Sequence, residues 1–377
     1  MRSATWGVCA AVICACGSQP GGGQGSVQQP PPTGPADAGT PPAGDKSVDF
    51  WKELVIVDSS VVLDARALSA NGGAWSFRRQ MEQLGSRHLA EGWLRTYRQT
   101  SLNGFAVEDR PGVEQLLASW PRDRDGSLDL AQAPFRLLAI VSRLDLTTSA
   151  RGEARLIYGL YDRASGAPRR MTVGFEYSLP ALGTTDDRAE WARRWHALGK
   201  LPFGDAYNAA LQQLTDAFAH GSSLSQLRAN EAQFGELWQL RQWVLDGGVL
   251  RLSPTPQTPD ESLNGSARLA QLILDNADAL RAGTAQIPAE LQGGTSPSIG
   301  AWVFKGEPRI DEALRHAFAQ QTCNGCHAQE TFSMQGFFHV SPFKPVVPGG
   351  NGQDRVSVFL KRDDLPRRVS RMQELLR

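Results

Sequence analysis

A six-residue stretch near the C-terminus carries the residue types best suited to holding a cofactor. Residues 322–327 read TCNGCH, so Cys323 and Cys326 stand three apart and His327 follows directly. Two thiols at this spacing can add to the two vinyl groups of one porphyrin, and the adjacent imidazole then lies under the iron as its proximal ligand. The motif therefore predicts one c-type haem attached to Cys323 and Cys326, with His327 bound to the iron.

Three residues further along the chain are candidates for the sixth iron ligand. Met334, His339 and Met372 follow His327 by seven, twelve and forty-five residues. The chain must pass around the porphyrin edge, and twelve residues span up to about 40 Å whereas seven span about 24 Å. His339 therefore reaches the other face more comfortably than Met334, and Met372 also suits the core of the last helix. Ligation by Met would raise the reduction potential relative to two His ligands.

The same cysteines have other possible uses. Together with His339 and either His327 or His316 they would make a Cys₂His₂ zinc site. His327 directly follows Cys326, which makes simultaneous tetrahedral ligation awkward. The two thiols could also stay free or form a disulfide, because an exported chain meets oxidising conditions.

The elements around the motif suggest a small cofactor unit over residues 301–377. We expect a helix over 311–321 leading into the motif and a terminal helix over 365–376. Between them lie apolar residues that could line a haem pocket, namely Phe332, Phe337, Phe338, Val340 and Phe343. This unit resembles a reduced class I cytochrome c, in which the first and last helices pack together. The unit is shorter than a class I cytochrome c domain and has no clear methionine loop.

The N-terminus reads as a lipoprotein signal peptide over residues 1–15. Arg2 supplies a positive charge, and the apolar stretch over 6–14 is too short to span a bilayer. The segment ends in ICAC, which resembles a lipobox, so cleavage after Ala15 would leave Cys16 joined to diacylglycerol and further acylated, for example with palmitate. Gly17 in place of Asp favours the outer membrane within the cell envelope. The alternative is an ordinary secretory signal with incidental cysteines.

Residues 16–46 predict a tether behind the lipidated Cys16. Residues 17–46 are rich in Gly, Pro and Gln and contain no large hydrophobic side chain. Such a segment cannot bury enough apolar surface to offset the entropy of ordering it. We therefore expect a disordered linker that holds the folded part away from the membrane.

The region 47–300 predicts an α+β globular domain of unknown role. Apolar or alternating patterns indicate strands over 54–57, 135–141, 155–161, 171–177, 237–245 and 249–252, the last four as two hairpins. Helical patterns lie over 76–99, around Trp191, Trp195 and Leu198, over 207–218 and over 263–280. Mixed strands and helices with hairpins favour the α+β class.

Three features of this region resemble functional sites but have simpler interpretations. Residues 123–129 contain three Asp, yet Gly126 is fourth and not sixth as a calcium loop requires. A solvated acidic turn is therefore expected. His196 and His220 are single histidines on predicted helices, which most often pack or face solvent. The Trp and Tyr residues of these helices predict core faces.

Several stretches together resemble a group of secreted bacterial lipoproteins of unassigned function that are sometimes labelled cytochrome c-like. They are PFRLLAIVSRLDL at 134–146, FEY at 175–177, WARRWHAL at 191–198, TCNGCHAQET at 322–331 and FFHVSP at 337–342. The resemblance covers nearly the whole exported chain and implies no substrate. It does imply a recurrent histidine after the motif, which here is His339, as a second ligand for either metal.

Charge and composition narrow the range of possible functions. The 377 residues contain 39 Lys and Arg and 39 Asp and Glu, so a nucleic-acid partner is not expected. No hydrolase, kinase or dehydrogenase signature occurs. The leading hypothesis is a membrane-tethered haem protein that exchanges electrons with a redox partner protein. The alternatives are a cell-surface binding or structural lipoprotein with zinc or a disulfide, and a redox enzyme whose haem serves a site in the middle domain.

Overall fold

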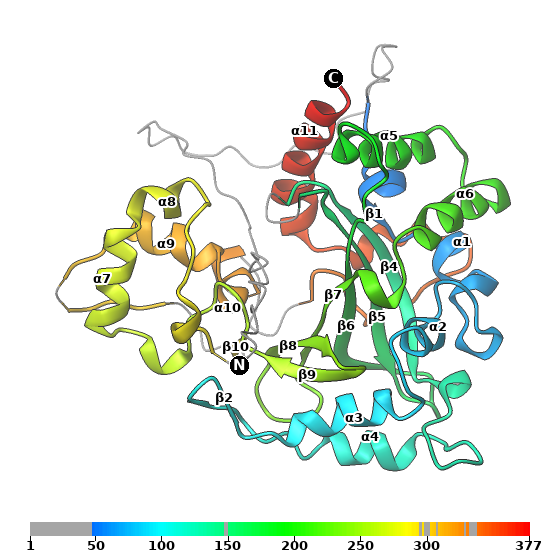
Figure 1. Ribbon diagram of the computed structural model, residues 1–377, viewed down its shortest axis with the longest axis horizontal. Coiled ribbons are helices and arrows are strands. Elements are labelled where there is room, and N and C mark those ends of the chain that lie inside the picture. The colour runs from blue at the N-terminus through cyan, green and yellow to red at the C-terminus, as the bar shows by residue number, and fades with distance from the viewer. Residues whose placement is uncertain are drawn as a thin grey trace, which may run out of the picture.

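A large antiparallel sheet is the centre of the fold (Figure 1). The computed structural model describes residues 47–146, 150–293, 296–297, 302–306, 308–327, 329–331 and 338–377. The strand order is β1-β4-β5-β6-β7-β8-β10, and β9 also pairs with β8. The strands are β1 (Val55–Ile56), β4 (Phe135–Arg143), β5 (Glu153–Tyr161), β6 (Pro168–Ser178), β7 (Leu224–Glu231), β8 (Gln239–Asp246), β9 (Val249–Ser253) and β10 (Ser296–Pro297). A separate hairpin joins β2 (Ser101–Leu102) and β3 (Phe105–Ala106).

Both predicted hairpins are present. β5 and β6 pair in antiparallel register with Ile157 opposite Gly174, and β8 pairs with β9 across Gly247-Gly248. Both glycines have positive φ, 57° and 78°, as a two-residue turn of this hand requires. The predicted strand over 54–57 is shortened to β1, because the π-helix η1 (Phe50–Leu54), capped by Asp49, takes up the residues before it. The α+β class is confirmed.

One face of the sheet is apolar and packs under helices. Phe77 of α2 (Phe77–Glu82) stacks on Phe135 with centroids 4.4 Å apart and contacts Tyr158 and Phe175 edge-on. Trp93 of α3 (Leu89–Arg95) joins the same aromatic cluster. The larger lobe also contains α1 (Ser59–Val62), α4 (Val113–Ser119), α5 (Asp187–Gly199) and α6 (Asp205–Asp216). Trp191, Trp195 and Leu198 of α5 are buried, so the predicted core role of these aromatic faces is confirmed.

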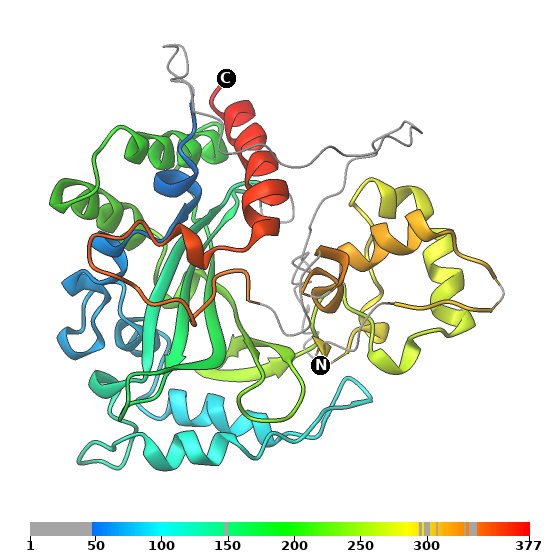
Figure 2. The ribbon, with the colours of Figure 1, turned by 180° about the vertical axis from the view of Figure 1, so that it is seen from behind.

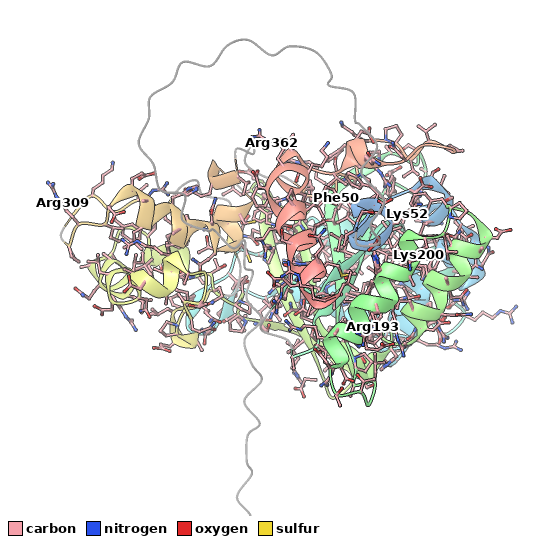
Figure 3. All side chains as sticks on the ribbon, turned by 90° about the horizontal axis from the view of Figure 1, so that it is seen from above. Phe50, Lys52, Arg193, Lys200, Arg309 and Arg362 are labelled. Atoms are coloured by element: carbon pink, nitrogen blue, oxygen red, sulfur yellow. The ribbon has the colours of Figure 1, made fainter. Side chains whose placement is uncertain are left out.

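A second hydrophobic core lies in a smaller helical lobe beside the sheet (Figure 2). The lobe contains α7 (Ala267–Asp275), α8 (Ala277–Arg281), α9 (Glu312–Gln320) and α10 (Cys323–Cys326). Its core combines Leu269 and Ile273 with Trp302, Leu314 and Phe318. The boundary expected at residue 300 therefore falls inside one packed core. Seen from above, Arg309 lies on the outer edge of this lobe, and Arg193 and Lys200 of α5 lie on the larger lobe (Figure 3).

The two helices that flank the motif form as predicted but belong to different lobes. α9 packs against α7, α8 and α10, whereas α11 (Leu365–Leu375) packs against α5 and η1 (Figure 1). Leu314 and Phe318 fill the small core, while Leu365 and Met372 fill the main core. The expected packing of first helix on last helix is corrected accordingly, because each apolar face is buried by a different partner.

Short helices and turns complete the chain. A second π-helix, η11 (Leu360–Asp364), leads into α11. The 3₁₀ turns are η2 (Ala65–Ala67), η3 (Ser69–Asn71), η4 (Thr96–Arg98), η5 (Leu130–Gln132), η6 (Gly221–Ser223), η7 (Glu261–Leu263), η8 (Ala289–Leu291), η9 (Gln329–Thr331) and η10 (Gln353–Arg355). Among the helices of the described residues, none has both the length and the apolar character needed to cross a membrane.

Candidate functional site

The motif forms one short helical turn, α10, directly after α9. Thr322 caps this turn, because its hydroxyl accepts a hydrogen bond from the Gly325 N–H at 3.1 Å. The indole N–H of Trp302 donates to the same hydroxyl at 3.0 Å, which ties the cap to the small core. Cys323 donates its backbone N–H to the Thr258 hydroxyl. Both cysteines are buried, with 0% and 4% of their surface exposed.

His327 ends this turn and lies against an aromatic ring. Its imidazole stacks on Trp238, which precedes β8, with centroids 5.1 Å apart and an angle of 27° between the planes. Trp238 belongs to a small apolar cluster with Cys323, Leu240 and Phe338. The turn therefore presents two thiols and one imidazole at the junction between the small lobe and the sheet.

His339 comes from a different segment and meets the turn. Its Nε2 lies 3.6 Å from Cys326 Sγ, and its ring centroid lies 4.5 Å from that of His327. Its Nδ1 lies 3.2 Å from Ser357 Oγ, and its backbone carbonyl accepts a hydrogen bond from the Ser357 N–H. A side-chain contact at one ring nitrogen fixes the ring so that the other nitrogen can serve a metal.

Electrostatics favours the neutral form of His339. Burial lowers its pKa well below the usual range, and the neighbouring His327 acts in the same direction. A neutral imidazole is the form that binds a metal ion. The structure thus brings His327, Cys326 and His339 close together.

The fit to a haem can be tested on these distances. Two buried thiols followed by an imidazole on one turn are the donors that a c-type haem needs. Metal–imidazole bonds are about 2 Å long, so two imidazoles on opposite sides of one metal have centroids roughly 6 Å apart. The observed 4.5 Å is shorter, and the cavity beside the two rings measures about 150 Å³. The donor types suit a haem, but the cavity is much smaller than a porphyrin, and ligation by both His requires the rings to separate.

The side chains of the site meet the requirements of a zinc ion only in part. A sulfur and a nitrogen bound to one tetrahedral zinc lie roughly 3.5 Å apart, given bonds of about 2.3 and 2.1 Å. The Cys326–His339 separation of 3.6 Å is close to that value. Within the described ranges, no three His, Cys, Asp or Glu side chains form a group that could hold a metal ion. His316 does not join the cysteines, because it contacts Glu330, which also pairs with Arg315.

The other candidate residues have structural surroundings. Met372 is 1% exposed and belongs to the main core. His196 lies 2.8 Å from Glu53, and His220 contacts Ser222 and Ser223. In the segment 123–129 Asp125 caps its own turn by accepting from the Ser127 N–H and hydroxyl. Met334, Phe332, Phe337 and residues 1–46 with Cys16 lie outside the described residues.

The sequence did not indicate which side chains contact the imidazoles of His327 and His339. Trp238 and Ser357 are far from the motif in sequence and carry no local signal. β7 was not predicted, and its polar residues Arg228 and Asn230 line the cavity beside His327 and His339. The available signal was the alternation of apolar and polar residues over 226–230.

Comparisons with protein-family models, with curated proteins and with solved structures find no match for this chain. The interpretation of the site therefore depends on its own residues and distances.

Proposed function

We propose that this chain is an exported, lipid-anchored protein that carries one c-type haem on Cys323 and Cys326 and uses it for electron transfer. His327 is the proposed proximal ligand, and His339 is the leading candidate for the sixth position. Cys16 is the proposed lipid anchor in the cell envelope, on the outer membrane. When bound, the haem would supply one-electron chemistry, and the chain would supply attachment, ligands and a partly dry environment.

The observation that carries the proposal is the meeting of His339 with the CNGCH turn. Two thiols and an imidazole on one turn satisfy the attachment pattern, and a second imidazole from a remote segment lies 4.5 Å from the first. Ser357 holds the far nitrogen of this second ring, as expected for a metal ligand. Trp238 packs flat against His327 and limits its movement.

The test is to produce the chain in a host that has the haem-attachment machinery and to record its spectrum. Purified protein should keep its haem through denaturation and acid-acetone extraction, because thioether bonds are covalent. The double variant C323A/C326A should retain none under the same treatment. A colourless wild-type protein from that host would overturn the proposal.

A zinc-binding structural lipoprotein is the second candidate, and the Cys326–His339 distance of 3.6 Å favours it. The same preparation separates the two functions. One zinc per chain in a colourless protein, lost in C326A and H339A, would establish this second function. A metal-free, colourless protein without reactive thiols would indicate a Cys323–Cys326 disulfide.

A further inference from the structure

The second face of the sheet carries a cluster of polar residues although the chain covers it. Arg155 of β5 lies opposite Glu176 of β6, and Thr172 of β6 lies opposite Asn230 of β7. Arg228 of β7 lies opposite Gly174. These side chains alternate with the apolar residues that fill the main core, so they point away from it. A covered sheet face is ordinarily apolar, and this departure calls for a functional reason.

These residues line the cavity that also contains His327 and His339. Among the described residues, four guanidinium groups and one carboxylate line it, namely Arg143, Arg155, Arg228 and Arg368 against Glu176. Arg143 pairs with Asp145 and Arg368 with Asp364, and neither of these aspartates lines the cavity.

The remaining two cations share the carboxylate of Glu176. Arg155 lies 3.3 Å and Arg228 lies 3.7 Å from Glu176 Oε2. Arg155 also contacts Glu153 at 3.1 Å. Burial raises the pKa of Glu153 despite the nearby Arg155. Burial would also raise the pKa of Glu176, but Arg155 and Arg228 hold it below its usual value. Two guanidinium groups therefore share the carboxylate of Glu176 on this wall.

A hydrogen-bond donor on the wall has unused bonding capacity. Arg155 Nε is buried and has no hydrogen-bond partner among the described residues. A buried polar atom without a partner is costly, and a bound ligand is one way in which such a group is satisfied. The cavity of about 150 Å³ matches the volume that accepts a molecule of about six non-hydrogen atoms, such as benzene.

We propose that this cavity is a carboxylate-binding site in which Arg155 and Arg228 hold the anion. Guanidinium groups match the geometry of a carboxylate and form two parallel hydrogen bonds with it. The carboxylate has two possible sources, a propionate of a haem attached at Cys323 and Cys326 or a free small carboxylate. The site uses residues on which the haem proposal does not depend, so either proposal can fail alone.

The experiment compares wild-type protein made with and without the haem-attachment machinery. Calorimetric titration uses acetate and succinate as probes and acetamide as a neutral molecule of the size of acetate. Binding of a carboxylate in both preparations identifies a site for a free ligand. Binding only in the haem-free preparation identifies the propionate as the occupant. Absence of carboxylate binding in both, or equal binding of acetamide and acetate, would overturn the proposal.

Variants locate the site. R155Q and R228Q should each weaken carboxylate binding by about tenfold or more, because each removes a charge-assisted hydrogen bond. R251Q is the matched control, since Arg251 on β9 pairs with the exposed Asp246 outside the cavity. Two Arg variants are used so that one can report if the other fails to fold, and thermal melting verifies the fold of each. The same loss in R251Q as in R155Q and R228Q would also overturn the proposal.

Discussion

The imidazole ring of His339 lies 4.5 Å from that of His327, beside a small apolar cluster that Cys323 of α10 shares with Phe338 and Trp238. His327 ends the turn α10 of the small lobe, whereas His339 is followed by Val340, which packs in the main core. The pair therefore joins the two lobes at the CNGCH turn. Binding of one ligand by both rings would depend on the relative position of the two lobes.

Replacing His339 should change the ligand environment of the proposed haem without releasing it. In H339A the haem should stay attached, because the thioethers involve only Cys323 and Cys326, while the visible spectrum shifts toward an open sixth position. H220A is the control, since His220 lies on the surface with Ser222 and Ser223. An H339A spectrum identical to the wild type would exclude His339 as a ligand. Met334 would then be indicated if M334A abolished a near-infrared band of His/Met iron.

Ser357 should act as a positioning residue for His339. Its Oγ lies 3.2 Å from His339 Nδ1 and also accepts a hydrogen bond from the Leu360 N–H. S357A should shift the reduction potential of haem-loaded protein, because the ring loses the contact that orients it. Loss of the Leu360 contact should cost about 1 kcal/mol of stability. S357T keeps the hydroxyl and should restore the potential. A change in melting temperature alone, with the potential unchanged, would leave Ser357 a purely structural role.

The sequence predicted most of the sheet, because local patterns specify strands and tight turns. Gly247-Gly248 indicated the β8–β9 hairpin, and the apolar run over 135–141 indicated β4. β7 was missed although apolar and polar residues alternate over 226–230. Gln226 and Arg228 are buried on the cavity side while Leu227 and Ala229 fill the core. A strand with one polar buried face carries no long apolar run, so the usual signal is weak.

The candidate site was predicted in part for a similar reason. The spacing of Cys323, Cys326 and His327 is local, and the reach of the chain favoured His339 over Met334. Trp238 and Ser357 approach only through tertiary packing, which no local pattern encodes. The assignment of residues 311–321 and 365–376 to one unit failed because an apolar helix face does not specify which core will bury it.

Asp145, whose carboxylate pairs with Arg367 of α11, should contribute strongly to the stability of the fold. Arg143 donates two hydrogen bonds of 2.9 Å to its carboxylate, and Arg367 lies 3.0 Å away. D145N should lower the free energy of unfolding by about 3–5 kcal/mol, because it leaves buried cations without their partner. D246N removes an exposed pair with Arg251 and should cost at most about 1 kcal/mol. Chemical denaturation of both variants measures the difference.

The effect of D145N should also depend on pH. Burial alone would raise the pKa of Asp145, but Arg143, Arg368 and Arg367 hold it far below its usual range. A carboxyl with a lowered folded pKa stabilises the fold above its unfolded pKa of about 3.9 and loses this contribution as the pH falls. The difference between wild type and D145N should stay constant from about pH 8 to 5 and shrink in stronger acid. A difference that grew on acidification would contradict the ion-pair explanation.

Replacing Cys16 tests the proposed lipid anchor. C16A should appear as a soluble exported protein or as an unprocessed precursor, because residue 16 no longer carries the thiol that would be acylated. Fractionation combined with fatty-acid labelling distinguishes these from the wild type. C9A, in the predicted leader, is the control and should be acylated normally. Normal acylation of C16A would rule out Cys16 as the anchor.

Gly325, inside the CNGCH motif, should be intolerant of a side chain. A Cβ at this position would lie 2.7 Å from the Ala319 carbonyl carbon and 2.8 Å from Thr322 Oγ1, and it would collide with the Ala319 carbonyl oxygen. Because these atoms include backbone and the cap of α10, G325A must displace the turn that carries both thiols. We expect a loss of about 1–3 kcal/mol in stability and less covalently retained haem.

Gly92 provides the matched control for this substitution. It lies within α3, and an added Cβ would meet no atom within 4 Å. G92A should therefore stabilise the protein by about 0.5–1 kcal/mol, since alanine favours a helix over glycine. Thermal melting and acid-acetone extraction of both variants provide the comparison. If G325A melted like the wild type and retained a full complement of haem, the close packing of α10 on α9 would not control the geometry of the motif. Loss of haem in G325A with unchanged melting would instead show that the shape of the turn itself is needed for attachment.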